Sequence, residues 1–133
     1  SALVMPFVVE HIESGKLIGM TTFMEIGEES RGMEIGMTWL APEHHGTMAN
    51  PEMKFLMLRH AFEVFGCMRV QLKCDARNLQ SQAAIRMHGA QYEGTLRKHG
   101  IQPCGHIRDT VMFSILDSEW PTVEAGLMKR LSA

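Results

Sequence analysis

The segment from residue 33 to residue 65 constrains the fold of this chain more than any other. Apolar residues alternate with polar or small ones from Met33 to Leu40, a pattern that predicts a β-strand with one buried face. A short loop follows, and then Asn50 and Pro51, residue types favoured at the N-cap and the first position of a helix. Apolar side chains recur at helical spacing up to Phe65, so we predict a strand, a loop and a buried helix in this order.

Similar reasoning places further elements on both sides of this segment. The remaining expected strands are 6–11, 17–23, 68–74, 90–98 and 107–116, and the remaining helices are a short one after Asn78 and an amphipathic one after Asp117. A right-handed crossover through the first helix would make strand 68–74 parallel to strand 33–40. Since the chain shows no repeat, low-complexity tract or linker, we expect residues 1–133 to form one domain.

The composition excludes several classes of partner. Of 133 residues, 45% are hydrophobic and 21% are charged, and 13 Lys plus Arg against 15 Asp plus Glu give a formal net charge of -2. Nucleic acids and anionic membranes attract a positive excess, so we expect neither as a partner. The longest apolar run, Leu3–Val9, is shorter than the ~18 residues of a membrane span. With no export signal and three cysteines, which cannot all pair, we expect a cytoplasmic protein.

The cysteines and histidines do not form a metal-binding pattern. Cys67, Cys74 and Cys104 lack the spacing of metal ligands and are interpreted as buried or incidental thiols. His44 and His45 are adjacent but have no third ligand at suitable spacing. We therefore expect no metal, and we interpret most of the 12 methionines as adaptable filling of the core.

Three features could converge on one site. A helix start offers free N–H groups and a positive dipole end, and Gly46 lets backbone approach a phosphate, although the same loop could be only a helix cap. Glu34 lies on the preceding strand, and Asn78 and Ser81 open the helix after the parallel strand. The alternatives are that Glu34 is a solvated strand residue, Asn78 a plain N-cap and Ser81 a helix-entry residue.

These residues match a family. The order β-β-β-α-β-α-β-β resembles the GNAT acetyltransferase superfamily, and more narrowly the RimJ/RimL-type branch of N-terminal acetyltransferases, from about residue 6 to residue 121. The motifs that carry the resemblance are Glu34-Ile-Gly-Met-Thr-Trp-Leu, His45-Gly-Thr-Met-Ala-Asn-Pro-Glu-Met-Lys54, Asn78-Leu-Gln-Ser81, Met87-His-Gly-Ala90 and Arg108-Asp-Thr110. The resemblance implies an α+β fold (an α/β three-layer arrangement), with a mixed, mostly antiparallel twisted sheet and helices on both faces. It also implies an N-terminally shortened domain, because the family's opening strand and first two helices have no counterpart here.

The resemblance further implies acetyl-CoA as cofactor and direct transfer of its acetyl group to a primary amine, such as a protein N-terminus. Glu34 would be the general base, because a protonated amine cannot attack a thioester. Ser81 would be the acid for the departing thiolate, and a backbone N–H within residues 38–40 would stabilise the oxyanion. The implied cofactor-binding residues are Trp39, Leu40, His45, Gly46, Thr47, Met48, Ala49, Asn50, Asn78 and Ser81.

The sequence departs from the family at two loop positions. Glu43 replaces the usual Arg or Gln at the first position of the phosphate loop, and Met48 replaces Gly or Ala at the last. Two other hypotheses remain open: a shortened, non-catalytic GNAT-like domain that binds acyl-CoA or a partner subunit, and an unrelated small α/β interaction protein. A sheet edge and an apolar face left uncovered predict a homodimer.

Overall fold

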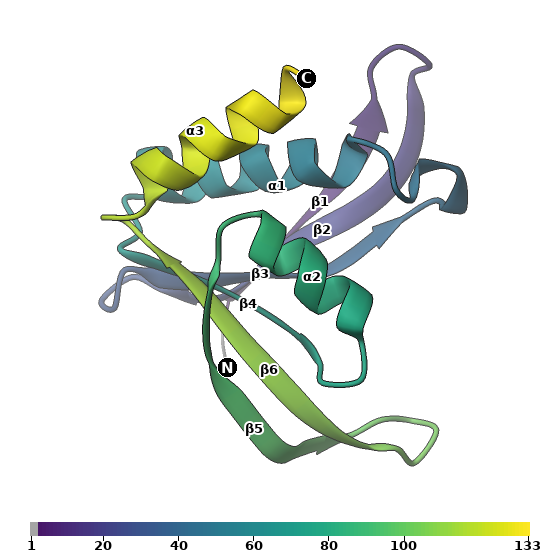
Figure 1. The fold of residues 1–133 in the computed structure, drawn as a ribbon, viewed down its shortest axis with the longest axis vertical. Coiled ribbons are helices and arrows are strands. Elements are labelled where there is room, and N and C mark those ends of the chain that lie inside the picture. The colour runs from purple at the N-terminus through teal and green to yellow at the C-terminus, as the bar shows by residue number, and fades with distance from the viewer. Residues whose placement is uncertain (1–2) are drawn as a thin grey trace.

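A twisted six-stranded sheet runs through the computed structural model, which describes residues 3–133 (Figure 1). Its strands are β1 (Leu3–His11), β2 (Lys16–Gly27), β3 (Gly32–Leu40), β4 (Arg69–Asp75), β5 (Gln91–Ile101) and β6 (Ile107–Leu116). They lie in the order β1-β2-β3-β4-β6-β5, with β3 and β4 parallel and every other neighbouring pair antiparallel. The predicted mixed, mostly antiparallel sheet is therefore confirmed.

Three helices accompany the sheet: α1 (Ala49–Arg59), α2 (Leu79–Met87) and α3 (Trp120–Leu131). A short 3₁₀ turn, Pro42–His44, precedes α1, and one π-helical turn, His60–Val64, extends it. The prediction of Asn50 as the N-cap is wrong, because α1 begins at Ala49 with Met48 at the cap position. The hydroxyl of Thr47 accepts a hydrogen bond from the Ala49 N–H at 3.2 Å, which allows the helix to start before Asn50.

All three helices lie on one face of the sheet. This face carries the neighbours Phe23 and Ile35 on β2 and β3, and the neighbours Leu72 and Phe113 on β4 and β6. Ile35 and Leu72 share a cavity with residues of α1 and α2, while α3 packs along α1 (Figure 1). The expected α+β fold is confirmed, and within residues 3–133 its helices lie on one face of the sheet instead of both. Hydrophobic periodicity shows that a strand face is buried, but not which element covers it.

The core lies between this sheet face and the helices. Phe23, Leu58, Val70, Phe113 and Ile115 are completely buried. The aromatic end of α1 is closed by α3, where Trp120 stacks on Phe62 with ring centroids 5.4 Å apart. Of the methionines, Met33, Met53 and Met57 are buried and seven others are exposed, so their interpretation as mainly core filling is wrong.

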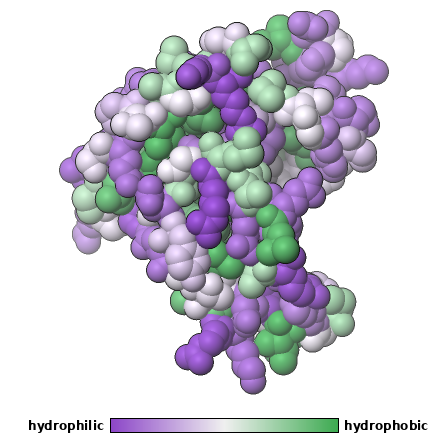
Figure 2. Space-filling view, viewed as in Figure 1, coloured by the Kyte–Doolittle hydropathy of each residue, from purple (hydrophilic) through white to green (hydrophobic). Residues whose placement is uncertain are grey.

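Two parts of the sheet extend beyond the core. β1 is an edge strand, and its outer side has no partner strand within residues 3–133. Several of its apolar side chains are exposed: Leu3, Val4, Met5, Phe7 and Val8. The β5–β6 hairpin projects away from the helices, and Figure 2 shows hydrophilic and hydrophobic residues mixed over it. Within the described chain, no helix is both long and apolar enough to cross a bilayer.

Close contact between β2 and β3 requires a glycine at position 19. A Cβ at Gly19 would lie 2.1 Å from the backbone oxygen of Trp39 and 2.9 Å from Leu40 Cδ2. We expect Gly19→Ala to lower the free energy of unfolding by about 1–3 kcal/mol, because the strands would have to move apart. Urea denaturation followed by circular dichroism measures this change.

Gly126→Ala is the matched control in this experiment. Gly126 lies inside α3, and a Cβ there would meet no atom within 4 Å. We expect Gly126→Ala to raise the free energy of unfolding by about 0.5–1 kcal/mol, because alanine loses less backbone entropy in a helix. Equal stability of the two variants would contradict the close packing assigned to Gly19.

Candidate functional site

A cleft opens where β3 and β4 separate. The two strands pair only through Gly32–Glu34 and Arg69–Gln71, and beyond this point each remains paired with its other neighbour. Met37 adopts a left-handed φ of 48°, which interrupts the regular course of β3. The resulting cavity of about 440 Å³ is bounded by β3, β4, the loop before α1, the first turns of α1 and one side of α2. Two helix N-termini therefore meet at one opening in the sheet.

Hydrogen bonds from two of its own side chains fix the conformation of the loop before α1. His45 Nε2 donates to the Leu40 carbonyl at 2.8 Å, and the Thr47 hydroxyl donates to the His44 carbonyl at 2.7 Å. Gly46 has a φ of +74° at the turn. The N–H groups of Gly46 and Asn50 make no hydrogen bond with the described residues. These N–H groups and the positive end of the α1 dipole make the loop suited to bind an anion.

The start of α2 faces the same cleft. The Asn78 Oδ1 accepts a hydrogen bond from the Ser81 N–H at 3.0 Å, so Asn78 is the N-cap of α2. This supports the simple capping interpretation of Asn78, although its amide NH₂ still has donor capacity. Both Asn78 and Ser81 line the cleft opposite the loop.

Glu34 lies at the point where the strands separate, on the face without helices. Its side chain is 1% exposed, and its Oε1 accepts from Gln71 Nε2 at 2.7 Å. The Lys73 Nζ forms an ion pair with Oε2 at 3.3 Å. Glu34 does not line the cleft itself, but Gly36, which does, is so close that a Cβ there would lie 3.4 Å from Oε2. The interpretation of Glu34 as a solvated residue is therefore wrong.

The structure brings together some of the residues implied by the resemblance and separates others. Those that line the cleft are Leu40, His45, Gly46, Asn50, Asn78 and Ser81. Thr47, Met48 and Ala49 face a different cavity, and the Trp39 side chain is 59% exposed on the surface.

Sequence reasoning missed the nitrogen-bearing side chains that line the cleft. Its basic lining residues are His44, His45, Lys54, Lys73 and His88, and no Asp or Glu is among the described residues that line it. Burial lowers the pKa of Lys54 to about 8, and burial, followed by the charges of Lys54 and Arg130, lowers the pKa of His88 to about 4. A signal for Lys54 was present, because it shares a helical stripe with Leu58 and Ala61, both completely buried.

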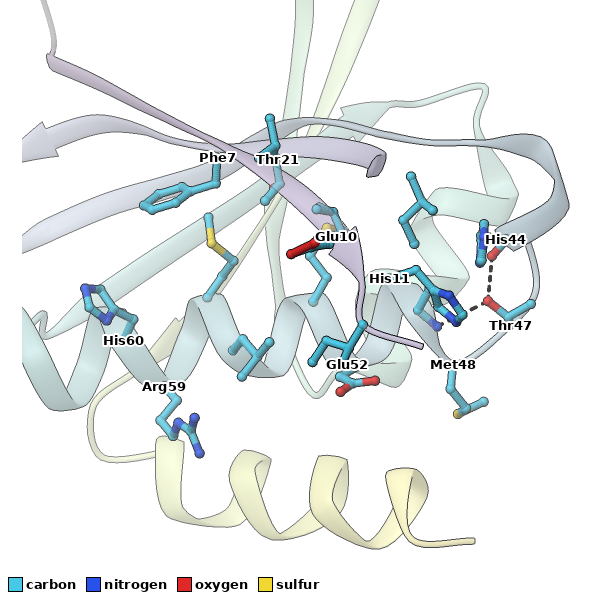
Figure 3. Close-up of a pocket in the computed structure, with 18 of the residues that line it drawn as sticks. Phe7, Glu10, His11, Thr21, His44, Thr47, Met48, Glu52, Arg59 and His60 are labelled. Atoms are coloured by element: carbon cyan, nitrogen blue, oxygen red, sulfur yellow. Dashed lines mark hydrogen bonds between the residues drawn. The ribbon is translucent and has the colours of Figure 1, made fainter. Parts of the chain in front are cut away.

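A second, larger cavity of about 1200 Å³ lies between β1 and α1. Figure 3 shows Phe7 and Thr21 on its strand side and Arg59 and His60 on its helix side. Its acidic lining residues are Glu10, Glu13, Glu43, Glu52 and Glu63. Because this cavity is rich in carboxylates and borders the sheet edge, it is a poor anion site, and the cleft between β3 and β4 is the better candidate.

Other reactive groups are not gathered into a site. Cys67 and Cys74 are buried free thiols, and burial raises the pKa of each. Among residues 3–133, no group of three or more His, Cys, Asp or Glu side chains is arranged to hold a metal ion.

Comparisons with known proteins agree with this architecture. Residues 2–91 match the family described as "Acetyltransferase (GNAT) domain". No curated protein matches the chain. A crystal structure from T. thermophilus, assigned to the acetyltransferases, is 44% identical over 87% of this chain and 61% of that chain, with a TM-score of 0.82. The structure of a GCN5-related N-acetyltransferase from Brucella melitensis is 33% identical over 94% of this chain and 56% of that chain, with a TM-score of 0.90.

A more distant similarity is to the dodecameric structure of spermidine N-acetyltransferase from Vibrio cholerae. It is 25% identical and covers 88% of this chain and 67% of that chain, with a TM-score of 0.79. The present chain thus spans less than two thirds of the length of the T. thermophilus and Brucella proteins. The family match, the sheet order and the cleft between β3 and β4 agree, and the chain belongs to the GNAT acetyltransferase family.

Proposed function

We propose that this chain is an acetyl-CoA-dependent N-acetyltransferase domain that transfers an acetyl group to a primary amine. The observation that carries the proposal is the cleft between β3 and β4, where the α1 N-terminus meets two lysines, three histidines and no carboxylate among the described lining. Such a cleft fits the pyrophosphate of coenzyme A. When bound, acetyl-CoA supplies the acetyl thioester.

The loop before α1 is the proposed phosphate-binding element. The N–H groups of Gly46 and Asn50 are free to donate to phosphate oxygens, while the side chains of His45 and Thr47 hold the loop in shape. Glu43, an unfavourable residue beside a phosphate, lines the other cavity. The departure from the family at this position is therefore compatible with binding.

We place the thioester end of the cofactor along β3, beyond the point where β4 stops pairing with that strand. A backbone N–H within residues 38–40 is assigned to polarise the thioester carbonyl. Glu34 is assigned as the base, acting through water, because its side chain does not line the cleft and its Oε2, ion-paired with Lys73, has no hydrogen-bond partner among the described residues. Ser81 is assigned to protonate the departing thiolate, and Asn78 to bind the pantetheine arm or the acceptor.

The acceptor is proposed from the similarities of the chain. The RimJ/RimL-type resemblance favours a protein N-terminus, and the similarity to spermidine N-acetyltransferase adds a polyamine as a second candidate. We further propose a cytoplasmic homodimer, since a second copy would cover the exposed apolar edge of β1.

Binding of acetyl-CoA is the first test, measured by isothermal titration calorimetry. We expect a dissociation constant of roughly 1 μM to 1 mM, the range typical of enzyme substrates. Gly46→Ala should weaken binding about tenfold, because an alanine disfavours the φ of +74° that presents the loop N–H groups.

Gly15→Ala is the control for backbone strain. Gly15 has a similar φ of +70° and equally open surroundings, but lies in the β1–β2 turn. We expect this variant to lose similar stability and to bind acetyl-CoA as the wild type does. Absence of wild-type binding at millimolar acetyl-CoA would contradict the proposed function.

The role of Glu34 is tested by Glu34→Gln, which keeps the shape of the side chain and removes its basicity. We expect transfer to amines to slow by roughly 10²–10⁴-fold with little change in acetyl-CoA affinity. Release of free thiol, followed with N-terminal peptides and with spermidine as acceptors, measures the rate.

Glu93→Gln is the matched control, because Glu93 belongs to the same polar row through Arg69 at 2.6 Å but lies away from the cleft. Its rate should stay near that of the wild type. Equal transfer rates of Glu34→Gln and wild type would contradict the assignment of Glu34 as the base. If the wild type binds acetyl-CoA but transfers no acetyl group, the result favours the non-catalytic alternative.

A further inference from the structure

Lys54 occupies a position unusual for a lysine. Its side chain belongs to a residue that is only 7% exposed, on the face of α1 turned toward the cleft. Lys54 Nζ donates to the Thr38 hydroxyl at 3.1 Å, and this hydroxyl is 2.9 Å from that of Thr21. An ammonium has three protons to donate, and no carboxylate lies among the described residues of the cleft lining to balance its charge. A buried cation without an anionic partner is costly in a folded protein.

His88 adds a second unsatisfied group to the same cleft. It lies directly after α2, is 2% exposed, and neither of its ring nitrogens has a hydrogen-bond partner among residues 3–133. Buried polar side chains almost always have a partner, so two unpaired ring nitrogens in a cleft indicate a ligand that is to supply one. His88 and Lys54 line the same cavity and are close enough for the charge of Lys54 to act on the histidine.

The direction of the Lys54 side chain suggests what that ligand is. Asn50 and Lys54 are one helical turn apart on α1, and both line the cleft. The Lys54 ammonium lies at the Thr38 hydroxyl of β3, on the strand side of the same cavity that Gly46 and Asn50 line. An anion at the N-terminus of α1 would thus meet backbone donors from the loop and a cation from the helix interior.

We infer that Lys54 and His88 form a buried subsite in the cleft that binds a phosphate oxygen of the ligand seated at the N-terminus of α1. The inference rests on the proposed function, in which this ligand is the pyrophosphate of acetyl-CoA. Lys54 supplies the charge, and His88, which is neutral at physiological pH, supplies a ring N–H. The ligand thereby gives a partner to one of the two His88 ring nitrogens, which have none among residues 3–133.

The subsite makes binding dependent on pH. Burial lowers the pKa of Lys54 to about 8, so in the free protein Lys54 is mostly charged at pH 7 and mostly neutral at pH 9. A bound anion favours the charged form and raises this pKa, so binding above pH 8 takes up a proton. The titratable groups that line the cleft with Lys54 are His88, Lys73, His44 and His45, and the charge of Arg130 on α3 also acts on His88.

The test is isothermal titration of the full chain at pH 7 and pH 9 with two probes, acetyl-CoA and ADP. With a Lys54 pKa of about 8, wild-type affinity should fall about tenfold between these values. At pH 8, titrations in buffers of different ionisation enthalpy should show net proton uptake. Constant wild-type affinity from pH 7 to pH 9 would overturn the inference without any variant.

Substitutions identify the residue responsible. We expect Lys54→Met to bind about tenfold more weakly at pH 7 and to lose the pH dependence. Lys54→Arg keeps its charge throughout this range, so it should bind without the decline at pH 9. His88→Phe should weaken binding several-fold. It should retain the loss of affinity between pH 7 and pH 9, because the group that loses its proton in this range is Lys54. Lys129→Met removes a charge from the exposed face of α3 and should behave as wild type.

The outcomes separate this inference from the proposed function. Normal binding of acetyl-CoA by Lys54→Met, with the wild-type pH dependence, would overturn the subsite and leave the function standing. Lys54-dependent binding of ADP without binding of acetyl-CoA would support the subsite and contradict the cofactor. If the wild type binds neither probe, both proposals fail.

Discussion

The separation of β3 from β4 is the constraint on which the rest of the site depends. Three residues of β3 pair with three residues of β4. Beyond them, the two strands no longer make the hydrogen bonds to each other that a continuous sheet would have. The sheet tolerates this opening because β3 stays paired with β2 and β4 with β6. The N-termini of α1 and α2 are directed to the gap, so unpaired strand edge and unpaired helix N–H groups face the same space.

Charge is segregated around this opening although the chain as a whole carries a net charge of -2. The described lining of the cleft is basic, while glutamates gather in the larger cavity between β1 and α1. The loop from His44 to Asn50 separates the two environments. Burying Lys54 without an anionic partner, and His88 without a hydrogen-bond partner among residues 3–133, costs stability, a cost that proteins accept where a ligand is to be bound.

The helix-free face of the sheet carries a connected row of polar side chains. Glu34 is bound by Gln71, Gln71 by Arg69, and Arg69 by Glu93. Lys73 joins the row at Glu34 and also lines the cleft. The proposed base is therefore fixed in position by neighbours on β4, and its surroundings connect the cleft to the opposite face of the sheet.

The sequence by itself determined the elements and the family. The strand at 33–40, the helix after Asn78 and the closing helix follow from periodicity and caps, which are local properties that the structure preserves within one or two residues. The start of α1 was predicted less well, because Asn50 is a favoured capping residue, whereas in the folded loop Thr47 binds the Ala49 N–H and the helix begins at Ala49.

Only the tertiary structure decided which groups meet in the cleft. Lys54 and His88 are far apart in sequence and come together because α1 and α2 pack on the same face of the sheet, which no local pattern specifies. Likewise, the partners of Glu34 come from β4, on the other side of a helical crossover. Periodicity reports which side chains are buried, whereas the charge and hydrogen-bonding state of a site depend on which buried side chains the fold brings into contact.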